Sequence, residues 1–443
     1  MGAWLFIVPL ILLLVVPFPL VLLLLPRKRE KRTSLRVAFV HPDLGIGGAE
    51  RLVVDAAVAL QKAGHEVYIY TARHEPDHCF EETRNGTLRV LVFGAFLPRR
   101  ILGHFYAACA YLRMCWVAMR VVIDAKSSPY DVLIVDQVSI CLPILLLAQA
   151  YGIIFYCHYP DYLLTSRASL LKSLYRVPLD FFEEQTTGIA NVVFVNSSFT
   201  AGVFAQAFPS LKERGLVPDV LYPALNLEEQ DKRAEQATES LEVLKEGEFL
   251  LISINRFERK KNIGLAVRAF AELPEAVRSG TRLVLAGGYD ERLPENVEHA
   301  AELEALAKEL GVSGRVTQMR SVSGAGLASL LRHAACLLYT PDREHFGIVP
   351  LEAMYARVPV VAVNSGGPLE SIVEGKTGFL RPPEPSAWAE ALQKLLGDAA
   401  LRRRLGEAGR KRVAENFSLE VFGRRLEETV RRLADGEEEK KHM

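Results

Sequence analysis

The sequence carries no excess of charge of either sign. Its 443 residues include 53 Lys and Arg and 53 Asp and Glu, so the formal net charge is zero. A protein dedicated to nucleic-acid binding usually has a basic excess or a basic stripe, and the balance therefore argues against that class. Intrinsic disorder is excluded as well, because 50% of the residues are hydrophobic and only 24% are charged.

Cysteine is scarce and shows no pairing pattern. None of the 6 cysteines belongs to a CxxC motif, so their spacing indicates neither a disulfide framework nor a thiolate zinc site. No group of His, Cys, Asp and Glu in the sequence has the spacing of metal ligands either. We therefore expect a site that works without a metal ion and without a resident cofactor.

Charged side chains are absent from residues 1–26, MGAWLFIVPLILLLVVPFPLVLLLLP. As a helix this run would be about 39 Å long, enough to cross a hydrocarbon core of about 30 Å. A cleaved signal peptide is the alternative, but no basic residue precedes the run and no small-residue cleavage site follows it. A basic cluster from Arg27 to Arg32 comes next, and by the positive-inside rule it leaves the rest of the chain in the cytosol. The sequence thus predicts an N-terminal transmembrane helix.

The charged tail, residues 436–443, ends in Lys440-Lys441-His442-Met443. Two lysines near a cytosolic C-terminus are typical of the retrieval signal of endoplasmic-reticulum membrane proteins, and a solvated charged tail is the alternative. Together with the anchor, the motif predicts a protein of the endoplasmic-reticulum membrane whose body lies on the cytosolic face.

Strand-like and helix-like segments alternate in two halves. The strand-like runs of the first half are 35–42, 66–71, 88–93, 132–136, 153–158 and 192–196, and those of the second are 249–254, 282–286, 315–319, 335–338 and 358–362. This alternation predicts an α/β protein with two doubly wound, Rossmann-like parallel sheets that face a cleft. Ligands in such folds bind at the carboxyl ends of the strands.

The predicted domains follow from this alternation and from the charged stretches. We expect an anchor over 1–26, a first Rossmann-like domain over 35–222, a polar linker over 223–247, a second Rossmann-like domain over 248–417, a closing helix over 418–435 and a tail over 436–443. The segment from 385 to 433 is expected to be helical throughout. The apolar run 138–156 is interrupted by proline and glycine, so we expect a helix and a buried strand there rather than a second membrane span.

A glycine-rich turn, Gly45-Ile46-Gly47-Gly48, follows the first predicted strand and precedes a helical pattern. Backbone N–H groups at such a helix start can bind a phosphate. Glu50 occupies the third glycine position of a dinucleotide-binding fingerprint, which argues against NAD. The turn is a candidate phosphate-binding loop, with tight packing as the alternative.

His158 is the last residue of the strand predicted at 153–158 and stands two residues before Pro160. Because proline stops regular structure there, we expect the imidazole to face the ligand cleft. A structural histidine is the alternative.

A basic turn follows the strand predicted at 249–254. Four cations, Arg256, Arg259, Lys260 and Lys261, lie within six residues, which is costly unless an anion is nearby. Two such donors could hold a diphosphate and stabilise a departing nucleoside diphosphate. A solvated turn is the alternative.

Two glutamates, Glu344 and Glu352, bracket the sequence EHFGIVPLE. Pro350 belongs in the first turn of a helix, so we expect that helix to start near Gly347, with Glu344 in the preceding loop. The two carboxylates then face different parts of one ligand, which argues against a glycosidase acid–base pair. A glycine-rich turn at 364–370 offers further backbone N–H groups.

These motifs together resemble the retaining GT-B glycosyltransferases of family 4, and in particular the mannosyltransferases of lipid-linked oligosaccharide synthesis. The resemblance is carried by HPDLGIGGAERLVVDAA, DQVS, FYCHYPD, VNSSFTA, SINRFERKKN, AGGYDER and EHFGIVPLEAMYARVPVVAVNSGGPLES. It implies GDP-mannose as donor and dolichyl-diphosphate Man-GlcNAc2 as acceptor, with addition of an α-1,3 and then an α-1,6 mannose for asparagine-linked glycosylation. It also implies a metal-independent site, and a complex with other mannosyltransferases of the pathway as a further partner.

The resemblance implies roles for individual residues. Glu344 corresponds to the glutamate that contacts the donor sugar or its leaving oxygen, and Glu352 to the one that holds the ribose hydroxyls. Arg256 and Lys261 correspond to the basic pair on the diphosphate, with Lys260 as a competitor for the place of Lys261. The remaining implied contacts are His158 beside the transferred sugar, Gly47 and Gly48 near the phosphate and acceptor, and Phe346, Gly347 and Ile348 in the donor motif.

Two segments mix apolar and basic residues as membrane-interface segments do. They are 96–102 and 162–182, the latter with Arg167, Lys172 and Arg176 among Leu and Phe. Core helix is the alternative for both. Two other functions remain open, namely a GT-B transferase that uses another nucleotide sugar and a non-catalytic membrane-tethered scaffold.

Overall fold

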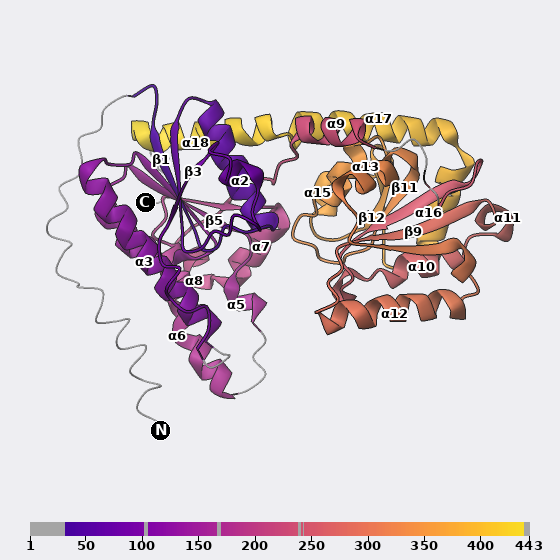
Figure 1. Cartoon of the computed structure of the whole chain (residues 1–443), viewed down its shortest axis with the longest axis horizontal. Coiled ribbons are helices and arrows are strands. Elements are labelled where there is room, and N and C mark those ends of the chain that lie inside the picture. Colours follow the sequence, from indigo (N-terminus) through magenta and orange to yellow (C-terminus); the bar gives the residue numbers. More distant parts are fainter. Residues whose placement is uncertain (1–31, 102–104, 166–169, 238–240, 242, 438–443) are drawn as a thin grey trace. The chain divides into compact units, whose positions relative to one another are not determined.

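The structure is a computed structural model that describes residues 32–101, 105–165, 170–237, 241 and 243–437. The predicted anchor over 1–26 and the lysine motif at 440–443 lie outside the described residues. The chain divides into two compact units, residues 1–222 with 422–443 and residues 223–421. Figure 1 shows both units, and each is described by itself.

The first unit is built on a seven-stranded sheet of order β3-β2-β1-β4-β5-β6-β7, in which every pairing is parallel. The strands are β1 (Arg36–His41), β2 (Glu66–Thr71), β3 (Arg89–Val92), β4 (Val132–Asp136), β5 (Gly152–Cys157), β6 (Val192–Val195) and β7 (Asp219–Val220). Strands β4 and β5 are buried along their whole length, as continuous apolar runs in a covered parallel sheet are. The sheet order brings the carboxyl ends of β1, β4 and β5 together.

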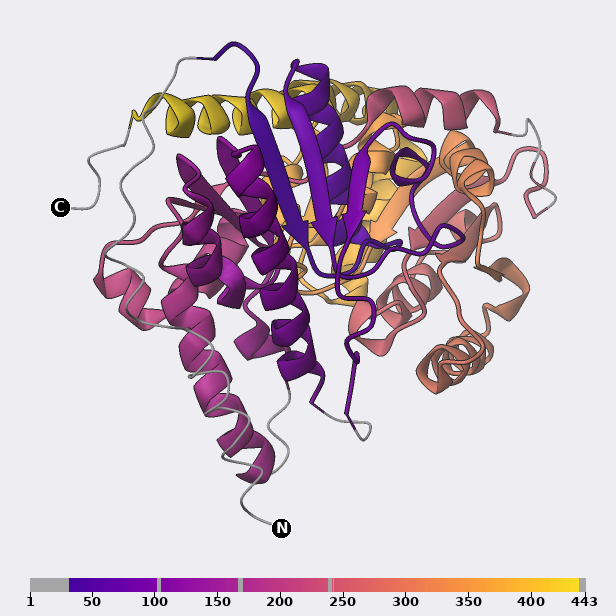
Figure 2. The same ribbon diagram turned by 60° about the vertical axis from the view of Figure 1, so that its left-hand side comes forward.

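Helices cover this sheet. They are α2 (Gly48–Lys62), α3 (Tyr106–Ser127), α4 (Leu142–Leu145), α5 (Asp161–Leu164), α6 (Leu170–Thr187), α7 (Ser198–Ala207), α8 (Pro209–Glu213) and α18 (Leu419–Asp435). Helices α3 and α6 run side by side in both views (Figures 1 and 2), and the Ala108 N–H of α3 donates to the Tyr175 hydroxyl of α6 at 3.1 Å.

The last helix, α18, closes the first unit from the far end of the chain. A Cβ atom added to Gly152 of β5 would lie 3.0 Å from the Leu433 side chain, and one added to Gly423 would lie 2.8 Å from Ala59 of α2. Both glycines thus permit close approach, and α18 is an integral part of this unit.

The second unit has a six-stranded sheet of order β10-β9-β8-β11-β12-β13, again parallel in every pairing. Its strands are β8 (Phe249–Ile254), β9 (Thr281–Gly287), β10 (Val316–Arg320), β11 (Ala334–Tyr339), β12 (Val360–Val363) and β13 (Gly378–Arg381). Its helices are α9 (Leu227–Glu235), α10 (Gly264–Ala271), α11 (Glu275–Arg278), α12 (Pro294–Glu309), α13 (Gly324–His333), α14 (Val349–Tyr355), α15 (Pro368–Ser371), α16 (Pro385–Gly397) and α17 (Ala399–Asn416).

The prediction of two α/β units with doubly wound parallel sheets is confirmed. The segment 138–156 holds α4 and most of β5, in agreement with the predicted helix and buried strand. The segment predicted to be helical from 385 to 433 is helical in three pieces, α16, α17 and α18. Asp398 starts α17 by accepting from the Leu401 N–H at 2.8 Å. The segment expected as a linker contains α9, whose first turn is capped by Asn226.

Among the described residues, α3 is the one helix long and apolar enough to cross a membrane. Its most apolar window is 44% buried within the fold, because one side of the helix packs on the sheet through Met114, Val117 and Val121. Helix α3 therefore also fits the description of a core helix.

Candidate active-site residues in the two units

Three side chains from neighbouring strand ends meet in the first unit. Asp136, the last residue of β4, has its Oδ2 atom 2.8 Å from His41 Nδ1 and its Oδ1 atom 2.7 Å from His158 Nε2. The Nε2 atom of His41 is 3.0 Å from the Asp43 carbonyl oxygen, so both ring nitrogens of His41 have partners. Asp136 and His41 are buried, while His158 keeps part of its ring exposed.

The charges of this cluster support each other. Burial would raise the pKa of Asp136, but the two histidines beside it lower that pKa below its usual value. Burial would lower the pKa of His41, but the hydrogen bond to Asp136 and the charge of Asp136 raise it. Asp136 is therefore a stable carboxylate that orients the ring of His158.

His41 and Asp136 were not among the predicted site residues. Each is the last residue of a buried apolar strand, which is the signal that could have found them. Their meeting depends on the sheet order, in which β4 pairs with both β1 and β5.

The turn that is predicted to bind a phosphate lies at the start of α2. Gly47 precedes the helix in extended conformation and Gly48 is its first residue. A Cβ atom on Gly47 would meet the Glu50 Oε2 atom at 2.2 Å, so the Glu50 carboxylate folds back over the turn. An anion could bind here only if that side chain moved aside.

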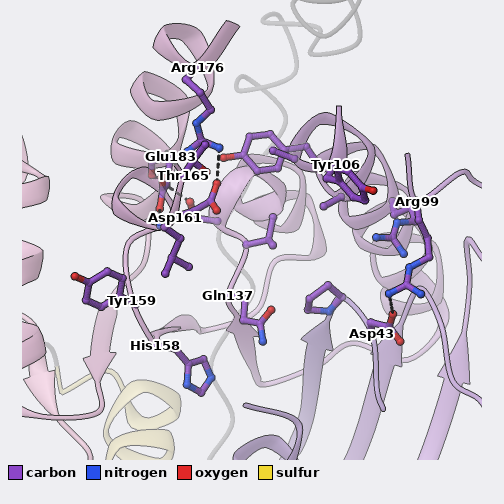
Figure 3. Close-up of a pocket in the computed structure, with 18 residues that line it drawn as sticks. Asp43, Arg99, Tyr106, Gln137, His158, Tyr159, Asp161, Thr165, Arg176 and Glu183 are labelled. Carbon is purple, nitrogen blue, oxygen red and sulfur yellow. Dashed lines mark hydrogen bonds and ion pairs between the residues drawn. The ribbon is translucent and has the colours of Figure 1, made fainter. Parts of the chain in front are cut away.

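A pocket of about 550 Å³ opens beside His158 in the first unit. It is lined by the ends of β1, β4 and β5 and by α3, α5 and α6. Figure 3 shows Asp43 and Arg99 at one side of the pocket and Asp161, Arg176 and Glu183 at the other. Arg99 Nη2 lies 3.1 Å from Asp43 Oδ2.

At the acidic side of the pocket, the charged side chains are held by ion pairs and hydrogen bonds. Arg176 Nη1 donates to Asp161 at 2.7 Å, and its Nη2 lies 2.7 Å from Asp180. Glu183 accepts from the Asp161 and Tyr162 backbone N–H groups at 2.7 and 3.0 Å. Burial, together with the charge of Asp161, raises the pKa of Glu183 to about 7. Arg176 is thus a buried structural cation, so any membrane contact of the segment 162–182 would have to come from its other residues.

In the second unit, the cation and the glutamate predicted for the donor meet. Lys261 Nζ donates to Glu344 Oε2 at 2.5 Å, and both side chains are largely buried. Thr340, just after β11, fixes the turn by donating its hydroxyl to the Lys261 carbonyl oxygen at 2.7 Å.

The other two predicted cations gather around a different carboxylate. Arg256 Nη1 and Lys260 Nζ each lie 3.1 Å from Glu258, and both cations are well exposed, with 63% and 68% of their side-chain surface accessible. Lys261, and not Lys260, is therefore the lysine beside Glu344.

The loop before α14 is held by close backbone contacts. Gly347 has a φ of +86°, and a Cβ atom there would lie 2.5 Å from the Tyr339 hydroxyl. Gly367 donates its N–H to the Glu344 carbonyl oxygen at 2.9 Å, and a Cβ atom on Gly367 would lie 2.1 Å from the Phe346 carbonyl oxygen. The glycine-rich turn at 364–370 thus shapes the loop that carries Glu344.

The rest of the donor motif divides by accessibility. The Phe346 ring is buried against Phe417, at a centroid distance of 5.8 Å, so only its backbone could meet a ligand. Ile348 precedes α14 and is partly exposed, and Glu352 lies in the first turn of that helix. Burial raises the pKa of Glu352 to about 7, opposed by the charge of Arg233.

In the described part of the chain, no three His, Cys, Asp or Glu side chains are grouped so that they could hold a metal ion. That the reaction needs no metal ion stays a prediction, because a metal ion could also be bound together with the substrate.

The chain matches two described families over both units. Residues 46–217 match Glycosyltransferase Family 4, and residues 235–412 match Glycosyl transferases group 1. Alpha-1,3/1,6-mannosyltransferase ALG2 of Homo sapiens is 49% identical over 414 residues, which are 92% of this chain and 98% of that protein. The proteins of the same name from Mus musculus and Saccharomyces cerevisiae are 48% and 41% identical, over 92% of this chain and 98% and 86% of theirs.

Solved structures share the fold at low sequence identity. Sucrose-phosphate synthase from Thermosynechococcus elongatus is 22% identical with a TM-score of 0.67, over 91% of this chain and all of that one. HepE of Anabaena in complex with UDP is 19% identical with a TM-score of 0.68, over 90% of this chain and all of that one. These likenesses confirm the predicted GT-B fold.

Proposed function

The chain belongs to the alpha-1,3/1,6-mannosyltransferase family, and on this premise we propose that it moves mannose from GDP-mannose to a dolichyl-diphosphate Man-GlcNAc2 acceptor. It is a glycosyltransferase, and this class needs a nucleotide sugar and a glycan acceptor. An α-1,3 mannose is added first and an α-1,6 mannose second. The observation that carries the proposal is the contact of Lys261 with Glu344, which joins the cation expected on the donor diphosphate to the carboxylate expected at the donor sugar.

The second unit would bind the donor. Lys261 and Arg256 neutralise the charge that develops on GDP as the bond between the anomeric carbon and the phosphate oxygen breaks. When the diphosphate arrives, Lys261 can divide its three N–H donors between the phosphate and Glu344. Glu344 is then held against the sugar, and Glu352 accepts from the ribose hydroxyls.

The first unit would position the acceptor and the transferred sugar. His158 has its Nε2 atom against Asp136, so the ring is fixed in orientation where it borders the pocket. Because the imidazole is already held in place, it need not be reoriented when the transition state forms. Polar groups preorganised in this way stabilise the transition state.

Retention of the anomeric configuration is explained by attack on the same face of the sugar. The acceptor hydroxyl oxygen bonds to the anomeric carbon while the departing phosphate oxygen takes the bonding electron pair and then the hydroxyl proton. No side chain is assigned as a nucleophile or as a base. Lys261, Arg256 and His158 act by holding charge and geometry.

A lipid acceptor also requires contact with a bilayer, and α6 supports this. Leu170, Leu174, Val177 and Phe181 are exposed, and their spacing of four, three and four residues places them on one side of the helix. Leu170 is 90% exposed. We propose that this side lies on the cytosolic face of the endoplasmic-reticulum membrane, with the predicted anchor at 1–26.

Phe96 and Ile101, in the other predicted interface segment, are exposed as well. The Phe96 ring packs edge-on against Trp116 of α3 at 5.4 Å. Exposed apolar residues on α3 continue this surface, namely Leu112, Trp116, Met119 and Ile123.

The function is tested with purified full-length protein, GDP-mannose and a synthetic lipid-diphosphate trisaccharide. We expect mono- and di-mannosylated products with α-1,3 and α-1,6 bonds. Transfer from a UDP-sugar instead would establish a different GT-B transferase, and failure to bind GDP-mannose at all would favour the scaffold.

A further inference from the structure

One arginine of the first unit is buried without an ion-pair partner among the residues that the structure describes. Arg113 of α3 is 8% exposed, and its Nε atom is buried without a hydrogen-bond partner. Its guanidinium makes no hydrogen bond or ion pair with any residue that the structure describes. An unpaired buried cation is costly, and native proteins rarely leave such a group without a purpose.

Arg113 lines the pocket beside His158, at the side that also carries Arg99 and Asp43. The groups that act on its charge are Asp43, which attracts it, and Arg99 and Arg73, which repel it. Asp43 is already paired with Arg99 at 3.1 Å, and Arg73 is paired with Glu75. Burial lowers the pKa of Arg113, because a buried charge is less well solvated. Since Arg113 and Arg99 share the carboxylate of Asp43 at this side of the pocket, positive charge is in excess there.

A second buried arginine in the same pocket provides a contrast. Arg176 is 2% exposed but is held by Asp161 and Asp180, each at 2.7 Å. The fold therefore supplies carboxylates where a buried guanidinium is structural. Among the described residues no carboxylate forms an ion pair with Arg113, which leaves its guanidinium available to an external anion.

We propose that Arg113, helped by Arg99, binds the diphosphate group of the acceptor in this pocket. Guanidinium groups bind phosphate oxygens through short charge-assisted hydrogen bonds. Gln137 and His158, which line the same pocket, are then left for the glycan of the same acceptor. The inference rests on the proposed function, because it takes the anion to be the diphosphate of a lipid-linked sugar.

The test compares two acceptors that carry the same trisaccharide and the same alkyl chain, one through a diphosphate and one through an uncharged glycosidic link. We expect Arg113→Gln to lower the preference for the diphosphate acceptor, measured as the ratio of kcat/KM values, by about tenfold or more. Arg113→Lys should restore part of it. An equal loss on both acceptors, or an unchanged ratio, would overturn the assignment.

The matched control is Arg120→Gln, because Arg120 lies on the same helix but is partly exposed and paired with Asp124 at 2.9 Å. Its acceptor preference should equal that of the parent protein. If Arg113→Gln does not fold, judged by its thermal midpoint, Arg99→Gln replaces it, since the Arg99 side chain is 58% exposed and its loss should not unfold the unit.

Binding separates this inference from the proposed function. A short alkyl diphosphate is titrated into protein saturated with GDP, which occupies the donor site. Binding that Arg113→Gln weakens about tenfold supports the diphosphate site even if no mannose is transferred. If the variant instead loses binding to phosphatidylserine vesicles and keeps the alkyl diphosphate, the anion is a bilayer phosphate and the proposal is wrong.

Discussion

Lys261 Nζ lies 2.5 Å from Glu344 Oε2, although the two residues stand 83 positions apart in the sequence. Lys261 follows β8, and Glu344 follows the neighbouring strand β11. A pair of this kind holds each side chain in place before the substrate arrives and leaves the remaining donors and acceptors for the substrate.

The first prediction concerns this pair. Lys261→Ala and Glu344→Ala should each lower mannose transfer by about a thousandfold or more, because each removes a group that acts on the leaving diphosphate or on the sugar. Both variants should still fold but with lowered thermal midpoints, because removing one partner leaves the other, largely buried charge unpaired. Arg292→Ala is the control, as Arg292 pairs with Asp290 at an exposed site. A Lys261→Ala enzyme that remained active would contradict the proposed role of Lys261 on the donor diphosphate.

The second prediction concerns Asp136. Asp136→Asn should lower kcat by about a hundredfold, because the neutral amide no longer fixes His158, while KM for GDP-mannose should hardly change. It should also lower the thermal midpoint, since the buried His41 loses its counter-charge. His158→Gln should lower kcat without that loss of stability. A Asp136→Asn enzyme with unchanged kcat would contradict the orienting role.

The pH dependence of stability follows from the same residues. The raised pKa of His41 means that its pairing stabilises the fold fully below its unfolded pKa of about 6.5 and is lost as pH rises through the folded pKa. The lowered pKa of Asp136 adds stability above about pH 4, which is lost in acid. The difference in thermal midpoint between the parent and His41→Gln should therefore shrink from pH 6 to pH 9.

The third prediction concerns Glu352, whose pKa burial raises to about 7. Because the unfolded carboxyl ionises near pH 4.3, this residue destabilises the fold increasingly as pH rises from there to about 7. Ionisation gives a better acceptor for the ribose hydroxyls, so KM for GDP-mannose should fall as pH rises through 7. Glu352→Gln should flatten both profiles. A profile identical to that of the parent would show that another group is responsible.

The fourth prediction concerns metal ions. Activity in excess EDTA should stay within about twofold of that without it, because Arg256 and Lys261 supply the charge that a divalent ion supplies elsewhere. A matched assay with added Mg²⁺ is the control. Loss of activity in EDTA that Mg²⁺ restores would contradict a metal-independent site.

The sequence was sufficient for the residues that follow buried strands in loops. His158, Lys261 and Glu344 lie in the loops that follow β5, β8 and β11, and parallel strands place such loops on one edge of a sheet. Pro350 correctly marked the first turn of α14. These predictions need only local pattern and the general rule for open α/β sheets.

What the sequence could not give depends on packing. In the sequence, Asp136 is distinguished only as the last residue of a strand. Its place beside His41 and His158 depends on β4 lying between β1 and β5. Arg113 stands in a helical run like any surface arginine, and only the packing of α3 makes it buried. Phe346 is predicted to contact the donor, and because its ring packs against Phe417 that contact is left to its backbone.

The return of α18 to the first unit has a consequence for biosynthesis. Its 17 residues form the last helix of the described chain, after the whole second unit, yet they contact Ala59 and Gly152 of the first unit. During synthesis the surfaces around Ala59 and Gly152 stay exposed until the whole second unit has left the ribosome. The first unit is thus completed only after the second unit has been synthesised. A premature stop codon before Leu419 would leave the first unit without α18.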